Sequence, residues 1–193
     1  MKLSRPALLL AALQITLVCT IAVKYLHERR TCPRAWVQVT QYDPELIMRG
    51  RYLSLQPIVN VCGLSKTLAQ HTVARPDPNW PTPESWEWLV HLRAENSNLI
   101  PVTSRSYTES ENDRGASMDD EQVRVTWLAT DPCEKATAHV GIELYVPERT
   151  KSPFPLPAGQ EAWLSVTIPP KGPPRGLQLA IKQNGVLTPL KLN

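Results

Sequence analysis

An alternating strand pattern occupies residues 51–61, which read RYLSLQPIVNV. Successive side chains of a strand point to opposite faces, so every second residue lines the same side. The apolar residues that share one face are Leu53, Leu55, Val59 and Val61. Pro57 has no N–H for a ladder hydrogen bond, so we expect this strand to be interrupted, or to lie at a sheet edge, near that residue. Gly50, just before the run, supplies a flexible corner after the turn that Asp43-Pro44 indicates.

Similar alternation recurs along the rest of the chain. It predicts further strands at residues 35–41, 122–128, 138–146, 162–168, 177–181 and 186–190. Asn184-Gly185 lies between the last two of these and is a strong signal for a two-residue hairpin. Regularly spaced short strands with turn signals are typical of an antiparallel barrel or sandwich. We therefore expect a mainly β fold.

One short helix is expected outside the N-terminal segment, at about residues 83–94. Thr82 is a suitable N-cap, and Pro83 suits the first helical position. Trp86, Leu89 and Val90 then fall on one helical face. This pattern favours a helix that packs as a lid over an open barrel.

The N-terminus carries an apolar run from Ala7 to Val23, which is 17 residues long and follows Lys2 and Arg5. That length reaches the lower end of what spans a bilayer. A cleaved signal peptide fits less well, because Thr20-Ile21-Ala22 is a poor cleavage site. Lipidation of Cys19 is disfavoured by the bulky Val18 before it. We therefore expect a signal anchor with a juxtamembrane segment over residues 1–30, followed by a β-rich domain over residues 31–193.

Basic residues flank this segment on both sides, so the positive-inside rule does not decide its orientation. Lys2 and Arg5 precede it, and Lys24, Arg29 and Arg30 follow it. Short N-terminal anchors commonly export the domain that follows them, and long domains translocate largely regardless of charge. We expect a single-pass membrane protein of a bacterial-type cell envelope, with its β domain on the extracytoplasmic, periplasmic side. Cleavage of the segment remains the alternative.

Three cysteines lie outside the apolar run, namely Cys32, Cys62 and Cys133. An odd number leaves one thiol spare if a bridge forms. Cys62 with Cys133 is the least strained pairing, because both residues fall at the ends of predicted strands.

Charge and composition exclude several functions. Beyond Lys2 and Arg5 the chain carries 19 basic and 18 acidic residues, which gives no electrostatic footprint for nucleic acid. Residues 104–121 are polar and read as a flexible loop, and their acids lack the alternating spacing of a calcium loop. The set Cys133, His139 and Glu143 matches no zinc spacing, and we expect neither a metal nor another cofactor.

Two separated motifs resemble the GDYXXLXY protein family. The first runs from Arg49 to Leu55 (RGRYLSL) and the second from Gly141 to Glu148 (GIELYVPE). The residues that match its pattern, and that serve as candidate interaction residues, are Gly50, Tyr52, Leu55, Gly141, Glu143, Tyr145, Pro147 and Glu148. Arg51 stands where the family has Asp, and Pro57 where it has the final Tyr, which weakens any catalytic role for the first motif. The resemblance implies a membrane-anchored envelope protein, and relatives are often encoded beside multi-span membrane proteins.

The same residues suggest what the domain does. Glu143 and Tyr145 fall on the strand face opposite Ile142 and Leu144, and Tyr52 can share that face. Together they would form a polar-aromatic patch for a membrane partner, and we lean towards a non-catalytic protein. One alternative is an envelope hydrolase or peptidase that uses Ser117, His139 or Glu143. Another is a small-ligand carrier that uses the barrel mouth and the tryptophans.

Overall fold

The computed structural model describes residues 5–42, 52–74, 82–103, 122–147 and 152–190. The chain divides into two compact units, Met1–Cys32 and Pro33–Asn193. Gly50, Arg51, Ser117, Glu148 and the predicted loop 104–121 lie outside the described residues.

The first unit contains one helix, α1, Arg5–Thr31. Its segment Leu8–Thr31 has 24 residues and contains an 18-residue window with a mean hydropathy of 1.9, so it is long and apolar enough to cross a membrane. Leu9 and Leu13 are among its exposed side chains, at 72% and 67%. The helix extends eight residues beyond the apolar run seen in the sequence, through Lys24 to the basic pair Arg29 and Arg30 in its last turn. Basic side chains near a helix C-terminus interact favourably with its dipole.

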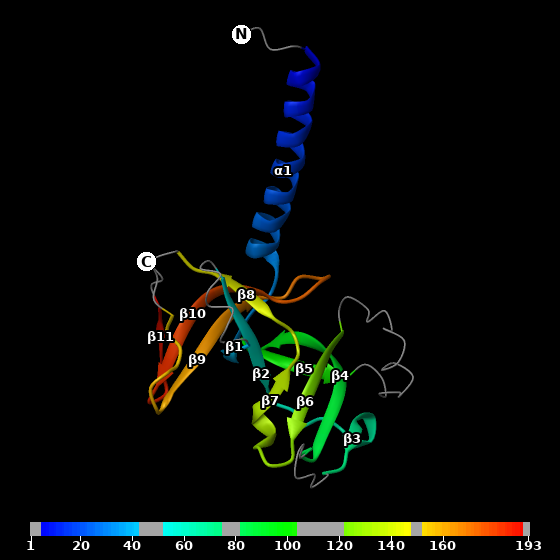
Figure 1. Ribbon diagram of the computed structural model, residues 1–193, viewed down its shortest axis with the longest axis vertical. Helices are drawn as coiled ribbons and strands as arrows, with labels where there is room; N and C mark the ends of the chain where they lie inside the picture. The colour runs from blue at the N-terminus through cyan, green and yellow to red at the C-terminus, as the bar shows by residue number, and fades with distance from the viewer. Residues whose placement is uncertain (1–4, 43–51, 75–81, 104–121, 148–151, 191–193) are drawn as a thin grey trace. The chain divides into compact units, whose positions relative to one another are not determined.

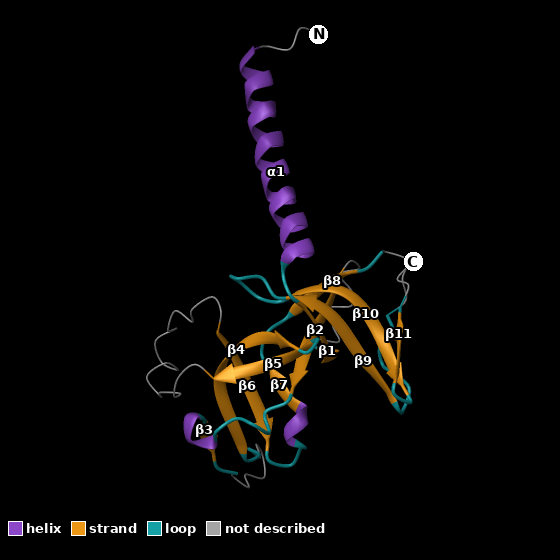
Figure 2. Cartoon of the chain, turned by 180° about the vertical axis from the view of Figure 1, so that it is seen from behind, coloured by secondary structure: helices purple, strands orange, loops and turns teal. Residues whose placement is uncertain are grey.

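The second unit is a β domain, and Figures 1 and 2 show its strands from opposite sides. The strands are β1 (Arg34–Gln41), β2 (Tyr52–Val59), β3 (Gln70–Thr72), β4 (Ser85–Glu95), β5 (Asn98–Thr103), β6 (Gln122–Leu128), β7 (Ala136–Ala138), β8 (Ile142–Tyr145), β9 (Gln160–Thr167), β10 (Arg175–Gln183) and β11 (Val186–Pro189). Short 3₁₀ turns lie at η2 (Lys66–Leu68) and η3 (Cys133–Lys135).

The strand pairings close a ring. The order is β11-β10-β9-β1-β5-β4-β6-β7-β2-β8, and β1 also pairs with β2. The six strands β1, β5, β4, β6, β7 and β2 therefore form a small barrel, from which β9, β10 and β11 extend on one side and β8 on the other. In both views β9–β11 lie together across β1 and β2 from β4–β6. The mainly β architecture is confirmed.

The barrel core follows the period-two pattern. Inward side chains of the first two strands are buried, for example Val37 at 2% and Leu55 at 0% exposure. The same holds for Trp88 at 1% and Val125 at 0% on the facing strands. Alternate residues of β8 are buried as well, so Ile142 and Leu144 join the core while Glu143 and Tyr145 do not. One continuous core thus contains buried residues of β1, β2 and β4 to β10.

The predicted helix at residues 83–94 is wrong, because Ser85–Glu95 is strand β4. Trp86, Leu89 and Val90 fit a helical face, but Trp88, Val90 and Leu92 also fit a period of two. β4 pairs with β5 on one side and with β6 on the other, so it is a central strand. Pairing on both sides stabilises the extended conformation over the weak local capping signals.

Pro57 does not interrupt β2, contrary to one of our two expectations. β8 pairs with Tyr52–Leu55 and β7 with Ile58 and Val59, which leaves Pro57 unpaired on that side. The Tyr42 N–H donates to the Ser54 carbonyl, so these two residues form a hydrogen-bonded pair of the β1–β2 ladder. Hydrogen-bonded and non-hydrogen-bonded pairs alternate along an antiparallel ladder, so Pro57, opposite Val39, occupies a non-hydrogen-bonded position. The missing N–H therefore faces the gap between two partner strands.

The other strand predictions are confirmed, but one predicted strand is divided, and the short strand β3 and the strand β5 were not predicted. Residues 138–146 divide into β7 and β8, separated by a bend at His139, Val140 and Gly141. β5 was missed, although it follows Asn96 and Ser97, whose φ angles of 48° and 64° form its hairpin turn with β4. The predicted hairpin between β10 and β11 is present at Asn184-Gly185. Its φ angles of 51° and 81° are those of a primed turn.

A disulfide joins Cys62 to Cys133, as expected from the strand ends, and Cys32 is free. The Val61 N–H also donates to the Cys133 carbonyl at 2.9 Å. The bridge therefore holds the loop after β2 against the turn before β7.

Removing this bridge should lower the free energy of unfolding by about 4 kcal/mol, because it closes a loop of 71 residues. The measurement is chemical denaturation of the Cys62→Ser, Cys133→Ser double variant of the full chain. The control is Cys32→Ser, which removes a free cysteine and should change stability by no more than about 0.5 kcal/mol. Equal stability of the double variant and the control would contradict this role.

Two glycines allow a matched test of backbone strain. Gly185 has a φ of +81°, so Gly185→Ala should cost about 1–2 kcal/mol. Gly63 lacks a positive φ and has open space round it, so Gly63→Ala should stabilise the chain by about 0.4–1 kcal/mol. Denaturation midpoints of the two variants should therefore move in opposite directions. Loss of stability of the same size in both would show that the turn is not the cause.

Candidate functional site

The outer face of β2 and β8 carries an exposed aromatic pair. Tyr52 lies opposite Tyr145 in the register, and their rings contact edge to face with centroids 5.8 Å apart. The two side chains are 53% and 60% exposed, which is high for such large residues. Glu143 precedes Tyr145 by two residues on β8 and lies opposite Ser54, so its side chain is on the same face. Glu143 is also exposed. We call Tyr52, Glu143 and Tyr145 the tyrosine patch.

The remaining motif residues are not part of the patch. Leu55 is fully buried in the core, so its role is packing. Gly141 lies in the bend before β8, where an added Cβ would be 3.6 Å from the Ser54 hydroxyl. Pro147 follows Val146 just after the end of β8 and is half-buried. Of the eight candidate residues, the structure thus brings three together on the surface.

Close approach of two strands holds β8 in place. β8 pairs with β2 along one edge, and β10 lies close to it without pairing. A Cβ added at Gly176 of β10 would lie 3.3 Å from the Glu143 carbonyl and 3.4 Å from the Ile142 side chain. Glycine at position 176 therefore lets β10 pack against the backbone that carries the patch.

A polar network that the sequence did not reveal lies farther along the same outer face. Thr126 donates to the Glu87 carboxylate at 3.2 Å and lies 2.8 Å from His139 Nε2. Because the single hydroxyl proton goes to Glu87, His139 Nε2 must be the donor to Thr126. His139 Nδ1 then accepts from the Gln56 amide at 3.4 Å. The four residues come from four separate segments, which is why no local motif indicated them.

Burial of the His139 ring favours its neutral form. Burial lowers the pKa of His139, the nearby Glu87 carboxylate opposes that shift, and Arg124 adds to it. The neutral ring is also the form that the two hydrogen bonds require. His139 is not placed to act as a base on the Thr126 hydroxyl, since its Nε2 donates that hydrogen bond. The arrangement therefore orders the sheet surface and does not resemble a hydrolytic dyad.

Tryptophans cluster at the disulfide end of the barrel. Trp86 pairs across strands with Trp127, and the Lys66 ammonium lies 4.8 Å and 4.7 Å from the centres of these rings. His71 stacks on Trp86 at 4.1 Å. A cavity of about 270 Å³ nearby is lined by Trp88, Trp127 and the disulfide, among others. Because Lys66 already occupies the space between the two rings, the cluster serves to close this end of the core.

The described residues contain one grouping with the proximity of a metal site, Cys62, Cys133 and Glu134. The two sulfur atoms are bonded to each other, so they cannot act as thiolate ligands. His139 and Glu143, weighed with Cys133 from the sequence, do not join this group.

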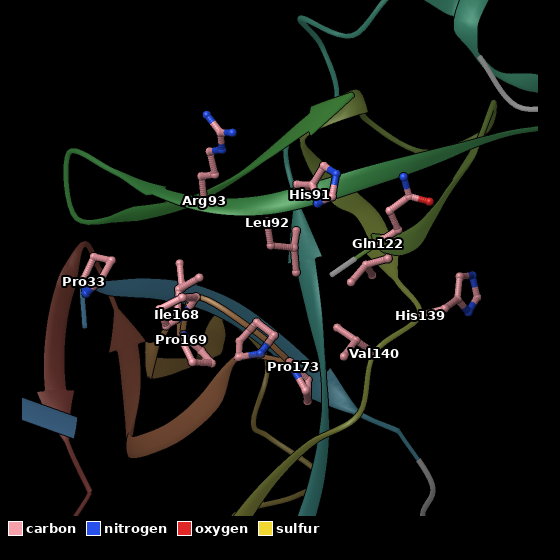
Figure 3. A pocket seen from close by; sticks show the side chains of 14 residues that line it. Pro33, His91, Leu92, Arg93, Gln122, His139, Val140, Ile168, Pro169 and Pro173 are labelled. Atoms are coloured by element: carbon pink, nitrogen blue, oxygen red, sulfur yellow. The ribbon is translucent and has the colours of Figure 1, made fainter. Parts of the chain in front are cut away.

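A cleft of about 510 Å³ opens in the β domain and is shown in Figure 3. Its walls come from the ends of β4 and β6, the bend after β7, Pro33 and the turn between β9 and β10. We refer to it as the proline cleft, because Pro33, Pro169, Pro170, Pro173 and Pro174 line it. None of the five described tryptophans contributes to its lining.

Comparisons with known proteins found no match among family models, curated proteins or solved structures. The site must therefore be interpreted from its own geometry.

The neutral state of His139 predicts a pH dependence of stability. The folded-state pKa is lowered, so the unfolded chain binds more protons than the folded chain once the pH falls below about 6.5. The free energy of unfolding should therefore decrease as the pH falls from 7 towards 5, and His139→Gln should make this decrease smaller. The measurement is a series of urea titrations across that range. Equal pH slopes for the variant and the parent would contradict the assignment.

Proposed function

We propose that this chain is a single-span protein of the cell envelope whose extracytoplasmic β domain binds a membrane-protein partner and is not catalytic. The observation that carries the proposal is the tyrosine patch. Tyrosine is enriched at the centres of protein interfaces, where its ring supplies contact area and its hydroxyl a hydrogen bond. Here two tyrosine rings, 53% and 60% exposed, lie beside a carboxylate on an ordered sheet face.

Two further features support the cellular setting. A helix with 24 apolar-rich residues in its spanning segment can anchor the chain in a membrane. The disulfide between Cys62 and Cys133 favours an oxidising compartment, since cytosolic thiols are kept reduced. Together these features favour an orientation with the β domain outside the cytoplasm.

The chemistry of the surface also favours binding over catalysis. The hydroxyl nearest His139 donates to Glu87, and both imidazole nitrogens have partners. Glu143 pairs in register with Ser54, whereas the His139 network involves Gln56, Thr126 and Glu87. The peptidase alternative depends on Ser117, which lies outside the described residues. No described contact favours that alternative.

Photo-crosslinking in intact membranes tests the proposal. A photoreactive amino acid in place of Tyr145 should give a specific heteromeric band. The same amino acid in place of Val186 is a matched control, because that side chain is 65% exposed but lies on β11. A monomer alone at both positions, or the same bands at both, would contradict a partner at the patch.

Affinity can then be compared between variants once the partner is captured. Tyr52→Ala should weaken binding by about 2 kcal/mol if the tyrosine is a central contact, which is about 30-fold in Kd. Val73→Ala changes another large exposed side chain, at 65%, and should leave Kd within about twofold. An equal loss in both variants would indicate a general effect on the domain.

A further inference from the structure

The shape and lining of the proline cleft point to a second binding site, independent of the tyrosine patch. Its volume of about 510 Å³ lies within the usual range of about 300–1,000 Å³ for small-molecule sites. It lies where β4 and β6 meet the bend after β7, the β9–β10 turn and Pro33.

The interior of the cleft is apolar. Leu92 and Val123 are the last inward residues of β4 and β6 on this side, and both are largely buried. In Figure 3, Leu92, Val140 and Ile168 lie round the hollow. Proline rings complete the wall opposite β4, and Pro169 and Pro174 are buried. An occupant of this part of the cleft would contact methyl groups and pyrrolidine rings.

The polar groups of the lining are not directed at an occupant. The ring of His139 is directed away from the hollow and is engaged by Gln56 and Thr126. His91 and Gln122 lie opposite each other in the register, and each already has an interaction partner. A sugar or a nucleotide needs several hydrogen-bond groups at the centre of its site, so it does not fit this lining.

The walls are fixed before anything binds. The Ile168 N–H donates to the Pro33 carbonyl at 3.1 Å, which ties the start of the β9–β10 turn to the segment before β1. That turn reads IPPKGPPR over residues 168–175, so four prolines restrict its backbone. The Val140 N–H donates to the Ala138 carbonyl at 2.8 Å and holds the bend on the other side. A preformed cleft loses little entropy when a ligand enters.

The charged residues at the rim of the cleft favour one sign of charge on the polar end of a ligand. Arg93 is the charged residue of the lining, is exposed, and points away from the hollow towards solvent. Lys171 is exposed between the two proline pairs of the turn. Among the described residues, no aspartate or glutamate lines the cleft. An anionic group left at the mouth is therefore favoured over a cationic one.

We propose that the proline cleft binds the alkyl chain of a single-chain anionic amphiphile, such as a fatty carboxylate. The chain occupies the apolar interior, and the carboxylate stays in solvent near Arg93. Each buried methylene should then raise the affinity about fourfold until the cleft is full. Such molecules occur in membranes, and this inference therefore rests on the proposed membrane anchor α1.

The test uses the full chain in lipid nanodiscs and a diazirine derivative of dodecanoate, with mass spectrometry to locate the label. Labelled peptides should include residues 168–174 and 91–93. Ile168→Trp fills the hollow and should reduce this labelling about tenfold. Val186→Trp adds the same side chain on β11 and should leave it unchanged.

A second pair of measurements separates the chain from the head group. Arg93→Glu should reduce labelling by the carboxylate probe and leave labelling by the corresponding dodecanol probe unchanged. Because Arg93 is exposed, this substitution should not disturb the core. Equal loss with both probes would overturn the role of charge. Label confined to residues 8–31, undiminished labelling in Ile168→Trp, or crosslinks from the cleft to a protein would overturn the amphiphile site.

Discussion

The pairing of β1 with β2 is the constraint on which the rest of the β domain depends. β1 pairs with β9 along one edge, and along the other it pairs first with β5 and then with β2. Without the β1–β2 pairs the sheet would remain an open ribbon, with the inward face of β4 and β6 uncovered. Pro57 does not lengthen the gap in the pairing of β2, because it lies where the partner on the edge away from β1 changes from β8 to β7.

This closure also determines which surfaces remain for binding. It places β8 at the end of the strand order with Glu143 and Tyr145 outward, beside Tyr52. The proline cleft lies elsewhere, between the ends of β4 and β6 and the β9–β10 turn. Between these two surfaces the polar groups of His139, Thr126 and Glu87 satisfy one another. The domain thus presents an exposed aromatic surface and a cleft with apolar walls. The polar groups of His139, Thr126 and Glu87 hydrogen-bond to one another and stabilise the sheet surface.

Much of this fold can be predicted from the sequence, because a half-buried strand imposes a period of two. Strands β2, β6, β9 and the β10–β11 hairpin follow directly from that period and from Asn184-Gly185. β4 could not be assigned in this way, because the pattern Trp86–Val90 fits a helix as well as a strand. Its pairing with β5 and β6, which the sequence does not reveal, makes it a strand. Asn96-Ser97 before β5 was an available turn signal that was missed.

The candidate site was accessible from sequence only in part. Tyr52, Glu143 and Tyr145 could be placed on one face because alternation specifies the side of a strand. The His139 network could not, since Gln56 and His139 are 83 residues apart and Glu87 and Thr126 are 39 apart. Their contacts depend on the register of β4, β6 and β7, which local patterns do not determine. The cleft likewise arises from strand order and not from any single segment.

The central claim is that the β domain works outside the cytoplasm while α1 holds it in the membrane. Cysteine alkylation in intact cells, read by mass spectrometry without prior reduction, tests this claim most directly. The account predicts that Cys62 and Cys133 are recovered as one linked, unalkylated pair of peptides in the membrane fraction. Recovery of both residues as alkylated thiols, or of the chain in the soluble cytoplasmic fraction, would contradict it.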